Sequence, residues 1–307
     1  MSRGIRLVAT DLDGTLVHSD GSITTRTRNA LLAAEEAGIA VVFVTGRPLR
    51  WAEEVFEHVG RHGLAVVSNG ALVWDVAAND VRMLRPIEPA VGLEVAELIR
   101  EAVPGSSFAV ETLAGIALEP RFLERRAMPD DVRRGELETI FDAPALKLLA
   151  RHEELDAQDY WDRALAAVGD RVVITWSSES ALLEMSAAGV TKASTLALLC
   201  AEGGIDTDEV LAIGDMPNDI AMLTWAGTSY AMANAHPTVR EAADLVAPTN
   251  DEDGVARVIE ELLAGRTGAL ETSYRPVVRT TSSYDVARVV RRPAWFSSWR
   301  SPWSAKP

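Results

Sequence analysis

The sequence predicts an α/β protein that has a parallel sheet and a second, smaller α+β domain inserted into it. Short apolar segments alternate with amphipathic segments at both ends of the chain, as in "RLVAT" (6–10), "TTRTRNALLAAEEAG" (24–38) and "IAVVFVT" (39–45). Strands that are apolar throughout are typical of a parallel sheet covered by helices on both faces. This alternation stops near residue 83 and resumes near residue 187, which indicates the insertion.

The alternating elements can be assigned in chain order. The helix over 24–38 has Thr24 as its N-cap and Gly38 as its stop signal. The remaining helices and strands of this pattern are expected as a helix at 49–60, a strand at 64–70, a helix at 191–204, a strand at 209–215, a helix at 217–227, a strand at 228–233 and helices at 239–243 and 253–265.

The middle of the chain reads differently. Residues 92–120 and 159–186 each suggest one helix followed by two strands, which predicts an open antiparallel sheet with helices on one face. We therefore expect a catalytic core at 1–82 and 187–266, an inserted cap domain at 83–186, and a tail at 267–307. One continuous large α/β domain is the alternative.

Composition and charge exclude several classes of protein. The 307 residues are 48% hydrophobic, carry a net charge of −15, and contain no apolar run near the roughly 18 residues that a membrane span requires. The tail holds seven basic and two acidic residues, so residues 1–266 carry a charge of −20, which disfavours nucleic-acid binding. The single cysteine, Cys200, is expected to be a buried thiol. With no signal peptide in the N-terminal segment, these features predict a cytoplasmic protein.

Polar residues follow several of the predicted strands. Asp11 ends the first strand, with Asp13 two positions later; Thr45 ends the second strand, and Asp215 ends a late one. Carboxyl ends of parallel strands share one edge of the sheet, so we expect these residues to converge there. Three close carboxylates repel one another unless a hard divalent cation lies among them, and Mg²⁺ suits such oxygen ligands.

Two further features predict a site for a phosphate group. Lys192 lies at the start of a helix, where the positive end of the helix dipole disfavours it unless a phosphate or the Asp11 carboxylate is near. Thr45 and the following Gly46 offer a hydroxyl and backbone amides to an anion. A carboxylate nucleophile, a metal ion, a lysine and a hydroxyl together indicate phosphoryl transfer.

Four motifs in order carry a resemblance to a known family. "DLDGT" (11–15), "VTGR" (44–47), "GVTKA" (189–193) and "GDMPND" (214–219) resemble the haloacid dehalogenase (HAD) superfamily, and "VVSNGA" (66–71) resembles its Cof-type branch. The resemblance covers about residues 1–266 and implies a Rossmann-like core with a type C2 cap of subfamily IIB. Residues 45 and 192 are 147 positions apart, so the cap lies between the second and third motifs.

The resemblance also implies roles for individual residues. Asp11 would be the nucleophile that forms an aspartyl-phosphate, and Asp13 the general acid and base. Mg²⁺ would be held by the Asp11 side chain, the Asp13 backbone carbonyl and Asp215, with Asp219 supporting the metal or Lys192. The residues assigned to the substrate phosphate are Thr45, Gly46, Lys192 and Asn218.

The expected function is therefore a Mg²⁺-dependent phosphatase that acts on small phosphomonoesters, such as sugar phosphates or related metabolites. The alternatives are a phosphomutase or phosphotransferase on the same scaffold and a non-catalytic binding protein on this fold. Asn69 is expected to be a turn residue that supports the site indirectly, with a residue that faces the substrate as the alternative. His236 is expected to be local loop structure, and Glu184 either a substrate contact or part of an exposed strand face. The tail, with Trp295, Trp299 and Trp303, is expected to be flexible; binding to an anionic surface or to the protein's own acidic body is the alternative.

Overall fold

A computed structural model describes residues 4–59, 63–123, 132–175 and 181–267. Its contacts divide the chain into two compact units, which are described separately. The first comprises Met1–Val44, His58–Gly63 and Lys192–Pro307, and the second comprises Thr45–Glu57 and Leu64–Thr191. The predicted tail at 267–307 lies outside the described residues from position 268 onward.

Parallel strands form the centre of the first unit. Their order is β14-β13-β12-β1-β2, with bounds Leu245–Ala247, Thr228–Met232, Val210–Gly214, Leu7–Thr10 and Ala40–Val44. Every residue of β1 and β12 is buried, so helices and loops cover both faces of these two strands. Leu7 is paired with Ala40 on one side and Val210 on the other, so the carboxyl ends of all three strands lie at one edge.

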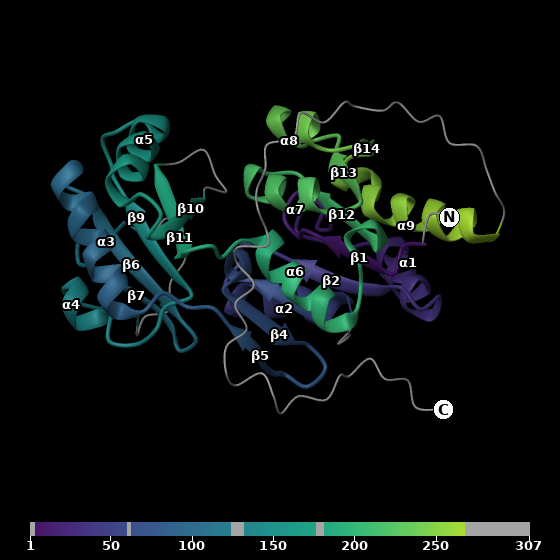
Figure 1. Ribbon diagram of the computed structural model, residues 1–307, viewed down its shortest axis with the longest axis horizontal. Helices are drawn as coiled ribbons and strands as arrows, with labels where there is room; N and C mark the ends of the chain where they lie inside the picture. Colours follow the sequence, from purple (N-terminus) through teal and green to yellow (C-terminus); the bar gives the residue numbers. More distant parts are fainter. Residues whose placement is uncertain (1–3, 60–62, 124–131, 176–180, 268–307) are drawn as a thin grey trace. The chain divides into compact units, whose positions relative to one another are not determined.

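Helices of the first unit occupy the positions expected from the sequence. They are α1 (Thr25–Glu36), α6 (Lys192–Gly203), α7 (Ile220–Trp225), α8 (Pro237–Ala242) and α9 (Gly254–Thr267). Thr24 is the N-cap of α1, and its hydroxyl accepts a hydrogen bond from Thr27 N at 3.1 Å. Helix α1 packs on α9, and α6 packs on α7 (Figure 1). Short 3₁₀ helices at Thr207–Glu209, Pro217–Asp219 and Asn250–Glu252 complete the connections.

The second unit contains an antiparallel meander and a larger sheet. Strands β3 (Leu64–Val67), β4 (Leu72–Asp75) and β5 (Asp80–Leu84) form the meander, and a 3₁₀ turn at Ser68–Gly70 links the first two. Helix α2 (Leu49–Val59) also begins in this unit. Six further strands are ordered β10-β11-β9-β6-β7-β8, with bounds Val172–Thr175, Leu182–Ala187, Lys147–Arg151, Ser107–Thr112, Gly115–Leu118 and Arg133–Arg134.

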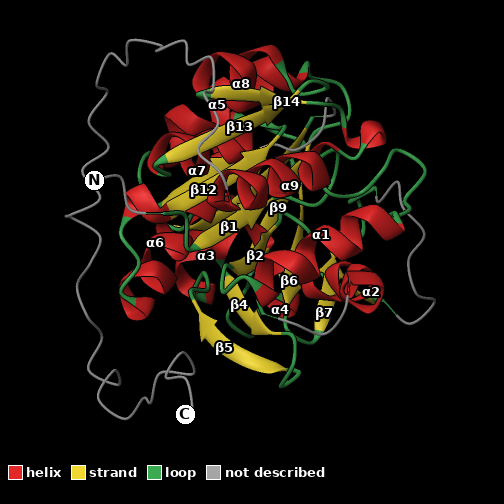
Figure 2. Cartoon of the chain, turned by 90° about the vertical axis from the view of Figure 1, so that its right-hand side faces the viewer, coloured by secondary structure: helices red, strands yellow, loops and turns green. Residues whose placement is uncertain are grey.

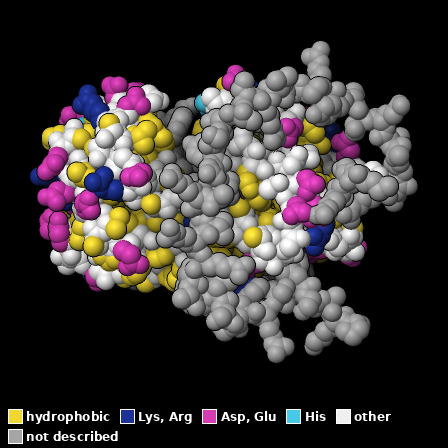
Figure 3. Space-filling view, in the orientation of Figure 1, with side chains coloured by type: hydrophobic (Ala, Val, Ile, Leu, Met, Phe, Trp, Pro, Cys, Tyr) yellow, Lys and Arg dark blue, Asp and Glu magenta, His cyan; other side chains and the backbone are white. Residues whose placement is uncertain are grey.

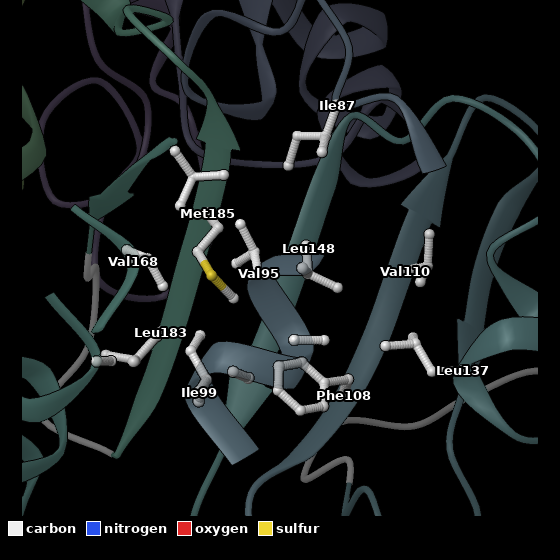
Figure 4. Close-up of a cluster of buried hydrophobic side chains, with 14 of the residues drawn as sticks. Ile87, Val95, Ile99, Phe108, Val110, Leu137, Leu148, Val168, Leu183 and Met185 are labelled. Carbon is white, nitrogen blue, oxygen red and sulfur yellow. The ribbon is translucent and has the colours of Figure 1, made fainter. Parts of the chain in front are cut away.

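One face of the six-stranded sheet is packed against helices. Helices α3 (Pro89–Ala102) and α5 (Ala157–Val168) contact each other, and α4 (Leu137–Ile140) contacts β6 and β7. Figure 4 shows side chains from α3 meeting apolar side chains from β6, β9 and β11. The alternate residues of the same strands, including Glu111, Lys147 and Glu184, face away from this cluster.

The two helix–strand–strand segments predicted for the middle of the chain are confirmed as α3-β6-β7 and α5-β10-β11. Strand β9, which lies between β6 and β11, was not predicted. Its first and last residues, Lys147 and Arg151, are both buried. The division of the chain at residues 83 and 186 stays a prediction.

The structure bears on two expectations from the composition, the absence of a membrane span and the burial of Cys200. In the part of the chain that the structure describes, no helix is long and apolar enough to cross a membrane. Cys200 is buried, and burial raises the pKa of its thiol to about 12, so this thiol stays protonated near neutral pH.

Candidate active site

Four charged side chains converge at the carboxyl edge of the first unit's sheet. Asp11 directly follows β1, Asp215 directly follows β12, Asp219 ends the next 3₁₀ turn, and Lys192 begins α6. All four are buried, with at most 6% of each residue exposed. One oxygen from each of the three carboxylates lies within 4.8 Å of the others. Asp11 N donates to Ile213 O at 3.0 Å, which extends the β1–β12 ladder into the site.

Lys192 lies between two of these carboxylates. Its Nζ donates to Asp11 Oδ1 and to Asp219 Oδ1, both at 2.6 Å. Burial alone would lower the pKa of Lys192, but the charges of Asp11 and Asp219 and their hydrogen bonds raise it above its usual value. The ammonium group is therefore charged at neutral pH, and its partners offset the unfavourable helix dipole at this position.

Asp219 uses both of its carboxylate oxygens within the protein. Oδ1 accepts from Lys192, and Oδ2 accepts from the backbone N of Asp215 and of Met216, both at 3.0 Å. The carboxylate also lies so close to Gly214 that a Cβ there would be 2.6 Å from Asp219 Cγ. Asp219 thus fixes the Asp215 loop and orients Lys192.

Asp215 is held by the loop that follows β1. Its Oδ1 accepts from Thr15 Oγ1 at 2.9 Å. Gly14 in the same loop has φ +69°, and a Cβ at Gly14 would lie 2.3 Å from Asp215 Oδ2. Glycine is required there both by the left-handed backbone conformation and by this close approach.

The carboxylates are in an environment that favours protonation unless a cation is present. Burial, followed by the charge of Asp219, raises the pKa of Asp215 to about 7. Burial also raises the pKa of Asp11 well above its usual value; Lys192 opposes this, while Asp219 and Asp215 add to it. Two acids that are costly to ionise together are the arrangement that a bound divalent cation stabilises.

The residues present fit a hard divalent cation such as Mg²⁺. Carboxylate oxygens from Asp11 and Asp215 come from two adjacent strand ends, and Mg²⁺ is commonly bound by one or two carboxylates with water and phosphate oxygens. Asp219 belongs to the same cluster, but its oxygens already accept three hydrogen bonds. We therefore expect it to support such a site without being a ligand.

The other predicted residues are placed as follows. Asp13 is exposed in the loop after β1, and Asn218 is partly exposed in the 3₁₀ turn before α7. Thr45 and Gly46 belong to the second unit and directly follow β2. Thr45 is buried, and its Oγ1 accepts from Arg47 N at 3.0 Å, so the hydroxyl keeps its own proton to donate. The structure thus places Lys192 in contact with Asp11 and Asp219. One carboxylate oxygen each from Asp11, Asp215 and Asp219 lies within 4.8 Å of the others.

Some polar residues were not assigned any role from the sequence. Thr15 lies within the first motif, but its hydrogen bond to Asp215 depends on a residue 200 positions away. Asn234 donates to Gly14 O at 2.8 Å, and these two residues are 220 positions apart.

His236 is local structure, as predicted, because it is the N-cap of α8.

A polar network in the second unit contradicts the interpretation of Glu184 as part of an exposed strand face. Asn69 adopts φ +56° in its turn, as expected, and its Nδ2 also donates to Glu184 Oε2 at 2.8 Å and to Thr175 Oγ1 at 3.1 Å. Lys147 Nζ lies 2.5 Å from the same Glu184 oxygen. Glu184 is therefore on a buried strand face, and the interpretation of an exposed face is wrong. The Lys147 ammonium group and the Asn69 amide together offset the cost of burying this carboxylate.

Comparison with known proteins agrees with this fold. The family model of the haloacid dehalogenase-like hydrolases matches residues 8–259. The 5-amino-6-(5-phospho-D-ribitylamino)uracil phosphatase YcsE of Bacillus subtilis is 32% identical over 83% of this chain and 94% of its own length. A phosphoglycolate phosphatase of Methanothermobacter thermautotrophicus is 28% identical over 84% of this chain and 99% of its own.

Solved structures show the same likeness. The structure of SMU.1108c from Streptococcus mutans has a TM-score of 0.74 at 25% identity and covers 85% of this chain and 100% of that one. A haloacid dehalogenase-like hydrolase from Bacillus subtilis has a TM-score of 0.72 at 25% identity and covers 84% of this chain and 100% of that one.

The fold and these matches define the class of protein, which is a hydrolase with a Rossmann-like α/β core and a cap domain. The chain belongs to the haloacid dehalogenase-like hydrolases, of Cof type and subfamily IIB, as the four motifs predicted. Its relatives identify it as a phosphoric monoester hydrolase. The predicted fold class, a Rossmann-like core with an α+β cap, is confirmed.

Proposed function

We propose that the protein is a Mg²⁺-dependent phosphatase that hydrolyses small phosphomonoesters, such as sugar phosphates, through an aspartyl-phosphate on Asp11. The observation that carries this proposal is the buried contact of Asp11 with Lys192 beside Asp215. A structural ion pair does not require a third carboxylate within 4.8 Å, whereas phosphoryl transfer needs a nucleophile, a cation and a fixed positive charge together.

In the first step, an Asp11 oxygen attacks phosphorus, and the bond between phosphorus and the leaving oxygen breaks. Asp13 gives its proton to that leaving oxygen, so an alcohol departs. In the second step, Asp13 takes a proton from water as the water oxygen attacks phosphorus. The bond to Asp11 then breaks, which releases inorganic phosphate and restores the carboxylate. The exposed position of Asp13 suits a group that exchanges protons with water.

The remaining residues are assigned to binding. The Asp11 and Asp215 carboxylates and the Asp13 backbone carbonyl would hold Mg²⁺, which supplies positive charge against the negative charge of the phosphoryl group. Lys192, Thr45, Gly46 and Asn218 would bind the phosphoryl oxygens. Lys192 is already charged and held by Asp219, so it needs no rearrangement to do so.

The inserted segment 83–186 is proposed as a cap over a core made of residues 1–82 and 187–266. Caps of this kind exclude water while the phosphoryl group is transferred to the protein. The expected partner is a small phosphorylated metabolite and not a nucleic acid. On the face drawn in Figure 3, acidic side chains outnumber basic ones among the described residues, which disfavours a phosphate backbone. The cytoplasm is the proposed location, since the chain has one cysteine and that thiol is buried.

The relatives guide the choice of substrates for a test. Their printed names specify 5-amino-6-(5-phospho-D-ribitylamino)uracil and phosphoglycolate, so the leaving groups differ in size and charge. A panel should therefore contain sugar phosphates, a phosphorylated ribityl compound and phosphoglycolate. Purified protein is expected to release inorganic phosphate from at least one of them with Mg²⁺ and to lose this activity in EDTA.

The outcomes of that assay separate the alternatives. An isomerised sugar phosphate without free phosphate would identify a phosphomutase on this scaffold. Binding of a phosphorylated compound without any turnover would identify a binding protein. No release of phosphate from any member of the panel, with Mg²⁺ present, would contradict the proposed function.

A further inference from the structure

The turn that follows β13, residues 233–236, contacts both of the loops that carry the site's acids. Asn234 Nδ2 donates to Gly14 O at 2.8 Å, and His236 N donates to Asp215 O at 2.9 Å. One loop follows β1 and the other follows β12. Strands β13, β12 and β1 are consecutive neighbours in the sheet (Figure 2). A single turn therefore ties together two loops that are 200 residues apart in the sequence.

A second asparagine fixes the orientation of Asn234. Asn250 N donates to Asn234 Oδ1 at 3.0 Å, so the amide nitrogen of Asn234 is the atom that faces Gly14. Asn250 is 5% exposed, and its own Nδ2 donates to Val17 O at 3.0 Å. The two asparagines thus hold the loop after β1 at both Gly14 and Val17.

Three hydrogen bonds to backbone oxygens hold the turn at residues 233–236 in place. Ala235 N donates to Met232 O at 2.9 Å, and Arg240 Nη1 donates to Ala233 O at 3.0 Å and to Ala235 O at 2.8 Å. An anchor with these internal hydrogen bonds can hold a neighbouring loop without moving itself.

A tether is needed at this point because the loop lies against a carboxylate. Gly14 packs so closely on Asp215 that even a methyl group does not fit between them. Asp11 and Asp13, on either side of Leu12 in the same loop, repel Asp215 when all are ionised. The hydrogen bond to Gly14 O opposes movement of this loop away from Asp215, as does the hydrogen bond from Thr15 to Asp215.

We propose that Asn234 is a positioning residue that sets the spacing between the Asp13–Gly14 backbone and Asp215, and thereby the affinity of the site for its divalent cation. This inference rests on the proposed function, because that function assigns the cation to these groups. Residues that orient ligands from outside the coordination sphere typically change metal affinity by about 10- to 100-fold when replaced.

The first test replaces Asn234 by leucine, which has a similar size but no donor or acceptor. The Kd of metal-free protein for Mn²⁺, used as an oxygen-seeking probe in place of Mg²⁺, is measured from free Mn²⁺ by electron paramagnetic resonance, with Mg²⁺ as competitor. We expect Asn234→Leu to raise the Kd about 10-fold or more. The Mg²⁺ concentration for half-maximal phosphatase activity should rise in parallel, while kcat at saturating Mg²⁺ changes much less.

A second variant separates positioning from electrostatics by the sign of its effect. Asn234→Asp keeps the acceptor for Asn250 N but removes the donor to Gly14 O and adds a negative charge. If only charge mattered, an added carboxylate would tighten cation binding. If the hydrogen bond positions the loop, binding weakens. We expect Asn234→Asp to weaken it.

A matched control comes from the other end of the same loop. Ser19 is exposed, and its Oγ donates to Asp251 Oδ2 at 2.8 Å. Ser19→Ala removes one hydrogen bond from this loop, as Asn234→Leu does, but far along the chain from Gly14. Its Mn²⁺ affinity should equal that of the wild type. Urea unfolding in EDTA verifies that each variant is folded.

The results distinguish the failure of this inference from that of the proposed function. Wild-type binding of Mn²⁺ together with unchanged binding by Asn234→Leu would overturn the role of Asn234 alone. Tighter binding by Asn234→Asp together with unchanged binding by Asn234→Leu would overturn the positioning role and show that only the added charge affects the site. A wild-type protein that binds no Mn²⁺ and shows no Mg²⁺-dependent turnover would overturn both proposals.

Discussion

Lys192 Nζ lies 2.6 Å from Asp11 Oδ1, although 181 residues separate them in the chain. The lysine begins a helix and the aspartate ends a strand, so each occupies a position where its charge is costly on its own. Together they form a neutral pair that is almost completely buried. This pair places a fixed positive charge beside the carboxylate that we propose as the nucleophile.

Replacing Asp11 by asparagine should remove turnover while keeping the fold. The amide has the same shape as the carboxylate, but it cannot attack phosphorus, so kcat is expected to fall by at least about 10³-fold. The measurement is phosphate release with Mg²⁺, with circular dichroism as the check on folding. Asp20→Asn is a suitable control, since Asp20 is an exposed acid of the same loop. Turnover by Asp11→Asn near the wild-type rate would exclude Asp11 as the nucleophile.

Replacing Lys192 by methionine should destabilise the protein strongly. Asp11 and Asp219 would remain buried without their shared cation, and breaking a buried pair in this way typically costs about 3–5 kcal/mol. Urea unfolding in EDTA measures the loss. Adding Asp219→Asn to Lys192→Met should recover part of it, because one uncompensated charge is removed. Equal stability of wild type and Lys192→Met would show that the pair does not stabilise the fold.

Gly14→Ala should be more damaging than Gly21→Ala. Both glycines have positive φ, +69° and +85°, so each alanine adds backbone strain of about 1–2 kcal/mol. Only at Gly14 does the new Cβ meet another group, Asp215 Oδ2 at 2.3 Å, whereas nothing lies within 4 Å at Gly21. We expect Gly21→Ala to retain activity and Gly14→Ala to lose both stability and most activity. Comparable activity of the two variants would argue against a close Gly14–Asp215 approach in solution.

In the metal-free protein, the titration of Asp215 should lower the stability as the pH rises through the acidic range. Burial and the charge of Asp219 raise the pKa of Asp215 from 3.8 to about 7, so the folded protein holds a proton that the unfolded chain releases. The free energy of unfolding contributed by this group therefore falls as pH increases from 3.8 to about 7, by up to about 1.4 kcal/mol per unit of pKa difference.

Urea unfolding in EDTA at several pH values provides the measurement. Asp215→Asn cannot titrate, so over this range its stability should fall less, or rise more, than that of the wild type, although Asp11 still contributes with the same sign. A wild-type stability that rises between pH 5 and pH 7 to the same extent as that of Asp215→Asn would contradict the prediction.

The polar network of the second unit shows where prediction from sequence stopped. Glu184 was expected to be either a substrate contact or part of an exposed strand face, and the strand that carries Lys147 was not predicted, yet both residues are buried and pair with each other. Charged residues are normally exposed, so a strand pattern containing them favours an exposed face. Their burial depends on the pairing of β9 with β11, which no local pattern encodes.

Local sequence patterns by themselves determined the parallel sheet, the helices that cover it and the four motifs that identify the family. They did so because apolar periodicity, caps such as Thr24 and strand-ending acids such as Asp11 are properties of neighbouring residues. Only the tertiary structure decided that Asp219 uses its oxygens on Lys192 and the Asp215 loop, and that Thr15 and Asn234 contact groups across the site. The contacts of Lys192, Thr15 and Asn234 join segments 27 to 220 residues apart, and the distance and direction between such segments are set by how the strands and helices pack.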